Sequence, residues 1–216
     1  QADVPTTWRV AATRGAILTA GADGLSLLIE QLRSGSPEMR EMALGATREL
    51  REPKVTSALV AELNQLTPPW QAAVISALVD RGDERALPAV EAKAQAGAED
   101  ARVAALRALG TMGRVSSLPI LLEAIRPPAG EAVTTAAYAS LTRINLPSAD
   151  AAILAALASA EPGVKVRLIG VLGDRTAGSA TGELMQLAAG ADVEIAKAAF
   201  RALGLVTSPA RLPQLP

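Results

Sequence analysis

Asp100-Ala-Arg-Val-Ala-Ala-Leu-Arg-Ala-Leu-Gly110 is the stretch that decides the fold, because its pattern returns along the chain at a nearly constant interval. Leu106 belongs to a series of large side chains spaced 31, 31, 32, 31 and 31 residues apart: Leu44, Ile75, Leu106, Tyr138, Ile169 and Phe200. Two more series, starting at Leu28 and Leu32, repeat these intervals. Such a period is typical of a solenoid, in which each repeat buries its apolar face against its neighbours.

Each repeat contains two helical patterns, which we term helix A and helix B. Prolines mark the starts of both, where the missing N–H has no intrahelical partner: Pro88 and Pro119 for helix A, and Pro37, Pro68 and Pro162 for helix B. Glycines are expected at the ends of the B helices as left-handed caps or close-packing points: Gly82, Gly110, Gly173 and Gly204. The extra residue of the 32-residue interval is expected at Pro127-Pro-Ala-Gly130.

The spacing predicts a single solenoid domain over residues 1–216. A lone helix B is expected at residues 8–20, since Trp8-Arg9 lies 31 residues before Met39-Arg40. Six two-helix repeats are expected to start near residues 24, 55, 86, 117, 149 and 180, followed by the start of a truncated repeat at residues 211–216. Because the pattern starts and stops in mid-repeat, we expect a segment of a larger protein, or ends that a partner covers.

The composition agrees with an all-α fold. Half of the 216 residues are hydrophobic but only 2% are aromatic, so the core must be built from Ala, Leu, Val and Ile. Alanine is the best helix former and lets helices approach closely. The abundance of Ala and Arg is also typical of a bacterial protein.

The net charge of −1 gives no general attraction to nucleic acid or to an anionic membrane. The longest apolar run, Ala151 to Ala158, is far shorter than the roughly 20 residues that span a bilayer. No leader sequence opens the chain, and cysteine is absent. We therefore expect a soluble protein without membrane insertion, and the choice between cytoplasm and periplasm stays open.

Three helix B segments resemble those of HEAT repeats: Asp100–Gly110, Pro162–Gly173 and Asp192–Gly204. The repeat length is similar to the short HEAT-like type associated with phycobilisome lyases. This resemblance covers residues 8–213 and implies a right-handed α-α superhelix of helical hairpins. It also implies A helices on the convex side and B helices along the concave side. Such repeats serve scaffolds, adaptors, lyase subunits, a hydroxylase and DNA-repair proteins, so the fold does not decide the function.

The 100° turn per residue predicts which side of helix B is exposed. Leu106 and Leu109 fall on the buried half, whereas Arg107 and Thr111 fall on the other half. Basic residues of the later repeats on that exposed face are the candidate contacts for an acidic protein or peptide: Arg107, Arg114, Arg143, Lys197 and Arg201. The earlier repeats present acids instead, namely Glu41, Glu49 and Asp80. The alternative is a solvated helix face whose charges only keep the protein soluble.

Three further sets of residues have structural interpretations. One column turns toward the buried side, where its polar ends should meet carboxylates or loop carbonyls: Arg9, Arg40, Gln71, Arg102, Thr134 and Lys165. Acids near the starts of B helices are expected to cap them: Glu38, Glu99, Asp100, Glu131, Glu161 and Asp192. Trp8 and Trp70 share a column two repeats apart, so packing or covering of the chain end is expected rather than one shared pocket.

Histidine and cysteine are absent, which removes the usual general base, the thiol nucleophile and the commonest transition-metal ligand. No Gly-rich phosphate loop is present. We therefore predict no catalytic residue, cofactor or metal, and a protein that is not an enzyme. The expected function is a protein-interaction scaffold that binds a partner segment along the concave face or joins other domains of its own chain. Nucleic-acid binding is the alternative, disfavoured because Glu41, Glu49 and Asp80 interrupt any basic groove. An enzyme or lyase subunit ranks third.

Overall fold

A computed structural model of the chain describes residues 4–50 and 52–207, and all regular structure in these residues is helical. The predicted all-α class is thus confirmed. The chain divides into two compact units within helix α7 (Glu99–Met112): the first runs to Ala108 and the second begins at Leu109. None of the helices in the described residues combines the length and hydrophobicity needed to cross a bilayer.

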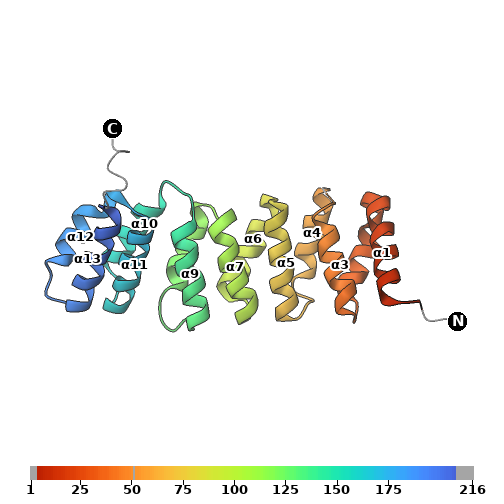
Figure 1. Ribbon diagram of the computed structural model, residues 1–216, viewed down its shortest axis with the longest axis horizontal. Coiled ribbons are helices and arrows are strands. Elements are labelled where there is room, and N and C mark those ends of the chain that lie inside the picture. The colour runs from red at the N-terminus through yellow and green to blue at the C-terminus, as the bar shows by residue number, and fades with distance from the viewer. Residues whose placement is uncertain (1–3, 51, 208–216) are drawn as a thin grey trace. The chain divides into compact units, whose positions relative to one another are not determined.

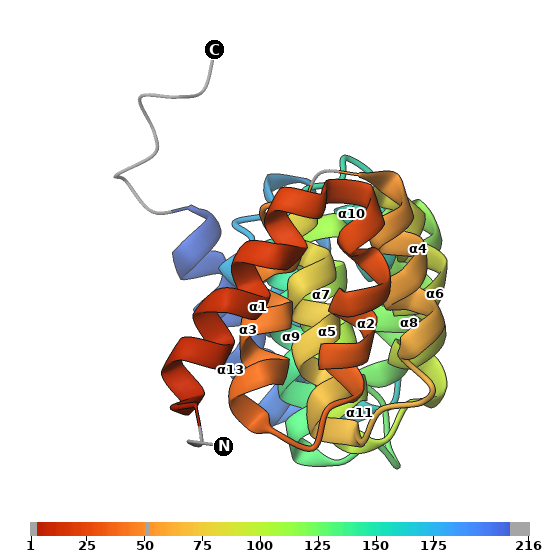
Figure 2. The same ribbon diagram turned by 90° about the vertical axis from the view of Figure 1, so that its right-hand side faces the viewer.

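The first unit contains a lone helix, α1 (Thr6–Ala20), followed by helical hairpins. The further helices of this unit are η1 (Gly21–Gly24), α2 (Leu25–Arg33), α3 (Pro37–Thr47), α4 (Pro53–Glu62), α5 (Pro68–Arg81), η2 (Glu84–Ala86), α6 (Leu87–Ala96) and the larger part of α7. The B helices α1, α3 and α5 pack one against the next, and α2 packs against α4. Figures 1 and 2 show these as two rows of helices, one of B helices and one of A helices.

The second unit repeats this arrangement. After the end of α7 it contains η3 (Val115–Ser117), α8 (Leu118–Ala124), α9 (Glu131–Arg143), α10 (Ala149–Ala158), α11 (Pro162–Asp174), η4 (Gly178–Ala180), α12 (Thr181–Ala188) and α13 (Val193–Val206). Helices α9, α11 and α13 pack in sequence, and α8 packs against α10. Each unit is therefore a stack of antiparallel hairpins, the architecture of an α-helical solenoid.

The A helices begin at Leu25, Pro53, Leu87, Leu118, Ala149 and Thr181, close to the repeat starts expected from the sequence. The segment between α8 and α9 spans residues 125–130 and contains the stretch where the extra residue was expected. That residues 1–216 form one domain stays a prediction. The expected start of a truncated repeat at residues 211–216 lies outside the described residues.

Most of the central apolar series is buried, but its last member is not. Leu44, Ile75, Leu106 and Ile169 are at most 9% exposed. Tyr138 is half-buried, and Phe200 is 64% exposed. The burial expected for Phe200 is wrong, because no helix follows α13 in the described part of the chain to cover it.

Glycines at the ends of the B helices serve in different ways. Gly82 caps α5 with a left-handed backbone, at a φ of 63°. Gly110 and Gly173 lie inside helices instead, where a Cβ would stand 2.9 Å from the Cα atoms of Ser140 and Ala202, respectively. Of the two roles expected for these glycines, left-handed cap or close-packing point, Gly110 and Gly173 have the second. Gly204 fits neither, since open space surrounds it.

Candidate partner-binding groove

A groove of about 880 Å³ lies between α1 and α3 in the first unit. We call it the α1–α3 groove. It is lined by one stripe of α1, namely Thr6, Thr7, Val10, Ala11 and Arg14, and by one stripe of α3 and the turn directly after it, namely Glu38, Glu41, Met42, Gly45, Arg48 and Glu49. Spacings of three and four residues place each stripe on a single helix face, so two helices present facing walls.

The groove exists because the side chains at its centre are small. Gly45 has no atom within 4 Å of the place where a Cβ would stand. The residue of α1 in the central apolar series is Thr13, where most later repeats place a large apolar side chain. Val10, Ala11 and Met42 give the groove an apolar lining, with charged residues around it. This combination of apolar surface and a polar rim is typical of protein-binding sites.

The arginines that line the groove are paired with acids of the next B helix. Arg14 contacts Glu49 at 2.5 Å, and both side chains are nearly half exposed. Arg48 contacts Asp80 at 2.7 Å. Exposed pairs of this kind contribute about 0–1 kcal/mol each, so they mainly fix side-chain positions. The early repeats are therefore less acidic than expected, because the sequence interpretation did not assign Arg14 and Arg48 as partners of Glu49 and Asp80.

Two further carboxylates line the groove, Glu38 and Glu41. Glu38 accepts a hydrogen bond from the Ser36 hydroxyl at 2.5 Å, and this bond is the largest cause of its lowered pKa. Glu41 is exposed one turn further along α3. The end of the groove nearest the start of α3 is thus negatively charged.

The second unit shows a filled version of the same arrangement. The ring of Tyr138 on α9 lies over Gly170 of α11, with Cε2 3.4 Å from the place where a Cβ would stand. Its hydroxyl donates a hydrogen bond to Asp174 at 2.6 Å. Burial, and then the hydrogen bond to Asp174, raises the pKa of Tyr138. A hollow of about 560 Å³ beside Tyr138 is lined by Glu131, Thr135 and Arg167, among others.

All five basic residues predicted to contact a partner are exposed: Arg107, Arg114, Arg143, Lys197 and Arg201. Arg107 belongs to the first unit and the other four to the second. Lys197 and Arg201 lie one turn apart on α13, and Lys197 contacts Glu194 at 2.9 Å. Arg143 lies against α7, with Nη2 2.9 Å from the position of a Cβ on Gly110. Their role in binding stays a prediction.

The inward-facing polar column is confirmed for its central members. Gln71 donates to the Leu66 carbonyl at 2.8 Å, and Arg102 donates to the Ala94 carbonyl at 3.0 Å. Thr134 donates to the Gly130 carbonyl at 3.0 Å. The inward orientation expected for Arg9 is wrong, because Arg9 is exposed and its side chain donates to the neighbouring Thr6.

The tryptophans and the acids near helix starts behave in different ways. The Arg40 guanidinium lies over the Trp70 ring, with its carbon 5.0 Å from the ring centre, whereas Trp8 is 71% exposed. The packing role expected for Trp8 is therefore wrong within the described residues. Asp192 caps α13 by accepting from the N–H groups of Glu194 and Ile195, as expected. The described residues hold no group of three or more acids that could bind a metal ion.

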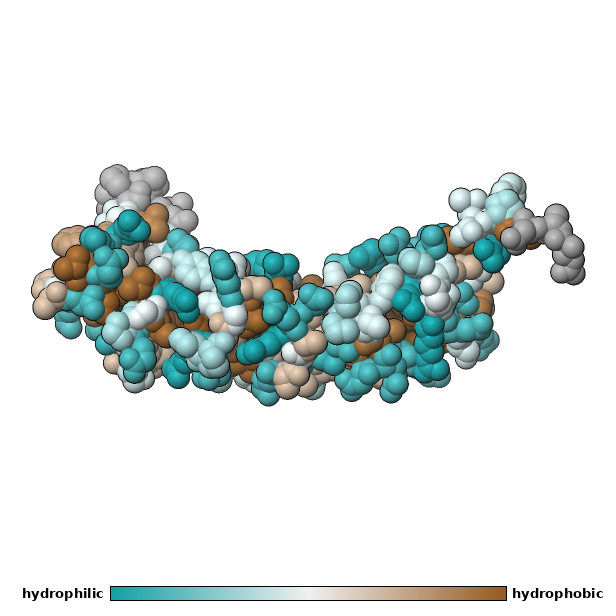
Figure 3. Space-filling model, turned by 90° about the horizontal axis from the view of Figure 1, so that it is seen from below, coloured by the Kyte–Doolittle hydropathy of each residue, from teal (hydrophilic) through white to brown (hydrophobic). Residues whose placement is uncertain are grey.

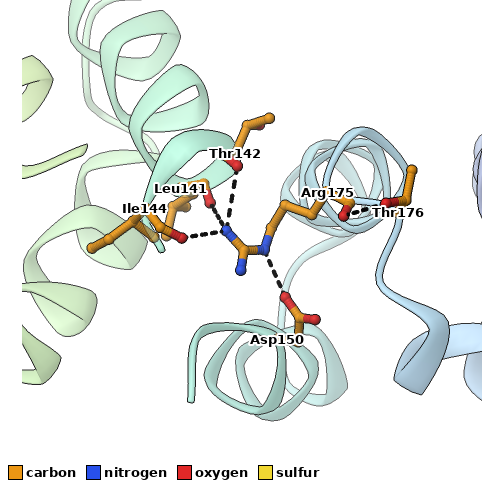
Figure 4. Close-up of polar contacts among 6 residues, drawn as sticks. All are labelled: Leu141, Thr142, Ile144, Asp150, Arg175 and Thr176. Atoms are coloured by element: carbon orange, nitrogen blue, oxygen red, sulfur yellow. Dashed lines mark hydrogen bonds and ion pairs between the residues drawn. The ribbon is translucent and has the colours of Figure 1, made fainter. Parts of the chain in front are cut away.

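Two arginines that the sequence interpretation missed join successive repeats. Arg175 donates from Nη1 to the carbonyl oxygens of Leu141 and Ile144, at 2.7 and 2.8 Å, and from Nε to Asp150 at 2.6 Å (Figure 4). Arg81 makes the equivalent contacts in the first unit. The sequence does relate these two residues, since Arg81 and Arg175 occupy the same repeat position three repeats apart. That position otherwise holds apolar residues such as Leu50 and Ile144, which hid the relation.

Hydrophobic side chains also gather over the last helices of the second unit, at the left of Figure 3. The exposed large apolar residues of these helices are Met185, Val193, Phe200 and Leu205. This surface lies where a following hairpin would pack if the stack continued.

Comparison with known proteins agrees with the hairpin architecture. Residues 56–142 match a family described as HEAT repeats. These residues make up less than half of the chain. No curated protein sequence matches the chain.

Two solved structures are similar to this chain. One is the complex of CpcE and CpcF of phycocyanin lyase from Nostoc sp. PCC7120, at 19% identity and a TM-score of 0.49, covering 96% of this chain and 91% of the other. The second is human deoxyhypusine hydroxylase, at 14% identity and a TM-score of 0.38, covering 94% and 91%.

These matches correct one prediction. Both structures are named for enzymes, so the prediction that a chain of this kind is not an enzyme is overturned. The absence of histidine and cysteine does not exclude a part in an enzyme. At these identities the likenesses transfer no activity, and the fold class rests on the helices of this chain.

Proposed function

We propose that the chain is a protein-binding scaffold whose first unit holds a partner segment in the α1–α3 groove. The groove itself carries this proposal, because it combines an apolar lining at Val10 and Met42 with charged groups around it. Binding sites for protein segments use this division, in which apolar contacts supply affinity and rim charges supply specificity. The partner is a separate protein or another domain of the same parent chain.

The exposed basic residues remain our proposed contacts for an acidic part of the partner: Arg107, Arg114, Arg143, Lys197 and Arg201. Arginine favours this role because its planar guanidinium can bind a carboxylate through two parallel hydrogen bonds. The acidic end of the α1–α3 groove and these basic residues would then contact differently charged parts of one partner.

Binding to nucleic acid is less well supported than binding to protein. The two arginines of the α1–α3 groove already contact Glu49 and Asp80, so their charge is balanced locally. Affinity for nucleic acid depends on cations that replace condensed counterions along the phosphates. We therefore expect the affinity for duplex DNA to be weak at physiological ionic strength.

Affinity capture from an extract of the source cells tests the proposal. Gly45→Leu places a side chain in the open space of the groove, whereas Gly15→Leu adds the same side chain to open space on α1 outside the groove lining. A partner that is recovered by the wild type and by Gly15→Leu but lost with Gly45→Leu would support the groove. A partner retained by Gly45→Leu would contradict it, provided that circular dichroism shows equal helicity.

The basic residues are tested in the same capture. Loss of the partner with Arg107→Glu/Arg143→Glu/Arg201→Glu, and recovery with Lys54→Glu as a charge reversal on the A helix α4, would support their role. Unchanged recovery with the triple variant would show that the exposed cations serve only as a solvated surface.

A further inference from the structure

The chain contains its own example of how a groove between two B helices is filled. Between α9 and α11, Tyr138 lays its ring over Gly170 and donates its hydroxyl hydrogen to Asp174. A Cβ at residue 170 would stand 2.8 Å from the Tyr138 hydroxyl oxygen, so the ring could keep this position only over a glycine. Gly170 and Asp174 form the seat of this phenol ring, Gly170 as its floor and Asp174 as the acceptor for its hydroxyl.

The α1–α3 groove has the same floor and the same acceptor but lacks the ring. Gly45 and Glu49 stand 125 residues before Gly170 and Asp174, which places them at the same positions of the repeat. Thr13 stands 125 residues before Tyr138. No atom lies within 4 Å of a Cβ position on Gly45, so the space that a tyrosine fills in the second unit is open in the first.

Glu49 can accept a phenol hydrogen in this place. Its Oε1 contacts Arg14, and a carboxylate has a second oxygen with further acceptor capacity. A hydrogen bond from a hydroxyl to a carboxylate is charge-assisted and stronger than one between neutral groups. Val10 and Met42 supply apolar contacts for the faces and edge of a ring.

The charges of the groove indicate what stands beside that ring. Arg14 is balanced by Glu49, and Arg48 is balanced by Asp80. Glu38 and Glu41 place two carboxylates at the end of the groove where α3 begins, and the charge of Arg9 acts on Glu38 there. This end is complementary to a lysine or arginine of the partner.

We infer that the α1–α3 groove binds a tyrosine side chain of a partner protein that carries a lysine or arginine close to that tyrosine in sequence. The tyrosine would take the place over Gly45 that Tyr138 takes over Gly170, and its hydroxyl would donate to Glu49. The inference rests on the proposed function, since it names the chemistry of the segment that the scaffold holds.

Selection of phage-displayed random peptides on the whole chain tests this chemistry without a known partner. We expect the selected sequences to share a tyrosine with a neighbouring lysine or arginine. The strongest peptide should bind the wild type and Gly15→Leu equally and should lose binding to Gly45→Leu. Replacing its tyrosine by phenylalanine should weaken binding about tenfold or more, because a hydrogen bond to a charged group is lost.

A second variant fills the groove from within. Thr13→Tyr would place the chain's own phenol over Gly45, so it should abolish binding of the selected peptide, while Thr13→Ser should leave it unchanged. Unchanged binding to Thr13→Tyr would overturn the inference. So would selected peptides that lack tyrosine, or a phenylalanine peptide that binds equally well.

The outcomes separate the inference from the proposed function. If Gly45→Leu abolishes capture of the cellular partner but the selected peptides contain no tyrosine, the scaffold function stands and the tyrosine is wrong. If Gly45→Leu changes neither capture nor peptide binding, both are wrong. Self-association of the chain that Gly45→Leu removes, measured by sedimentation, would show a second copy as the occupant and overturn the inference.

Discussion

Arg81 and Arg175 make the same set of contacts in two different repeats. Each guanidinium reaches carbonyl oxygens at the end of the preceding B helix, Thr47 and Leu50 for Arg81 and Leu141 and Ile144 for Arg175. Nε of each donates to a side chain of the preceding A helix, Thr56 or Asp150. A cation at these carbonyls also balances the negative end of the helix dipole. Burial lowers the pKa of Arg81, and Asp83 and Glu52 oppose that shift.

Replacing Arg175 should therefore weaken the second unit strongly. Arg175→Met keeps most of the side-chain volume but leaves the α9 carbonyls and Asp150 without their donor. We expect the free energy of unfolding to fall by about 2–4 kcal/mol in urea titrations. Arg126→Met is the control, since Arg126 only contacts the exposed Glu123 at 3.7 Å and should cost about 0.5 kcal/mol or less. Equal losses for the two variants would show that the carbonyl contacts do not stabilise the fold.

Replacement by alanine should change stability in opposite directions at two glycines of the B helices. Gly45→Ala meets open space and replaces a poor helix former, so it should stabilise the chain by about 0.5–1 kcal/mol. Gly173→Ala would bring a Cβ within 2.9 Å of the Ala202 Cα atom and should destabilise it by about 1–2 kcal/mol. Thermal or urea unfolding of both variants checks this. A gain in stability for Gly173→Ala would contradict the close packing of α11 on α13.

Tyr138 is the only tyrosine, so near-ultraviolet absorbance titration reports its ionisation alone. Burial and the hydrogen bond to Asp174 raise its pKa, and we expect a midpoint clearly above the usual value of about 10. Since the folded pKa is the higher one, the stability that this raised pKa supplies is fully present below about pH 10 and is lost as the pH rises toward the folded value. Asp174→Asn should lower the midpoint part of the way, because burial remains. A midpoint near 10 in the wild type would mean that Tyr138 does not occupy its seat over Gly170.

Leu106 and Arg107 are neighbours in sequence with opposite environments. Leu106 is fully buried, whereas Arg107 is exposed. Leu106→Ala should cost about 2–5 kcal/mol of unfolding free energy through the cavity it leaves. Arg107→Ala should change it by about 0.5 kcal/mol or less. Chemical unfolding of the two variants distinguishes them, and similar losses would mean that the faces of α7 are assigned wrongly.

The interval between repeats was sufficient to predict most of the fold. Leu106 and its equivalents specify where each B helix is buried, and the same period places the A helices, because one local pattern is repeated with the same neighbours. Phe200 shows where this argument fails: its type obeys the pattern, but its burial depends on a helix that would have to follow it. Periodicity predicts which repeat position a residue occupies, but it does not predict whether the helix that would cover that position is present.

The candidate groove was not predictable from the same columns. Glu49 and Asp80 were interpreted as an acidic surface, since their partners Arg14 and Arg48 lie about one repeat earlier and in different columns from each other. Gly45 leaves open space beside α3, and Thr13 stands on α1 at the position where Tyr138 fills the equivalent space in the second unit. Each residue alone is unremarkable in sequence, and only the packing of α1 on α3 brings their columns together.

The carbonyl contacts of Arg81 and Arg175 act between successive repeats, whereas their contacts to Thr56 and Asp150 lie within one hairpin. In a stack of hairpins, total stability is the sum of what each hairpin contributes by itself and what each junction adds. Both guanidinium groups contribute to the junction, because they satisfy the carbonyls of the hairpin before their own. Loss of either arginine should therefore reduce nearest-neighbour coupling as well as the stability of the hairpin that carries it. Unfolding would then become less cooperative, with separate steps for the hairpins on the two sides of the weakened junction.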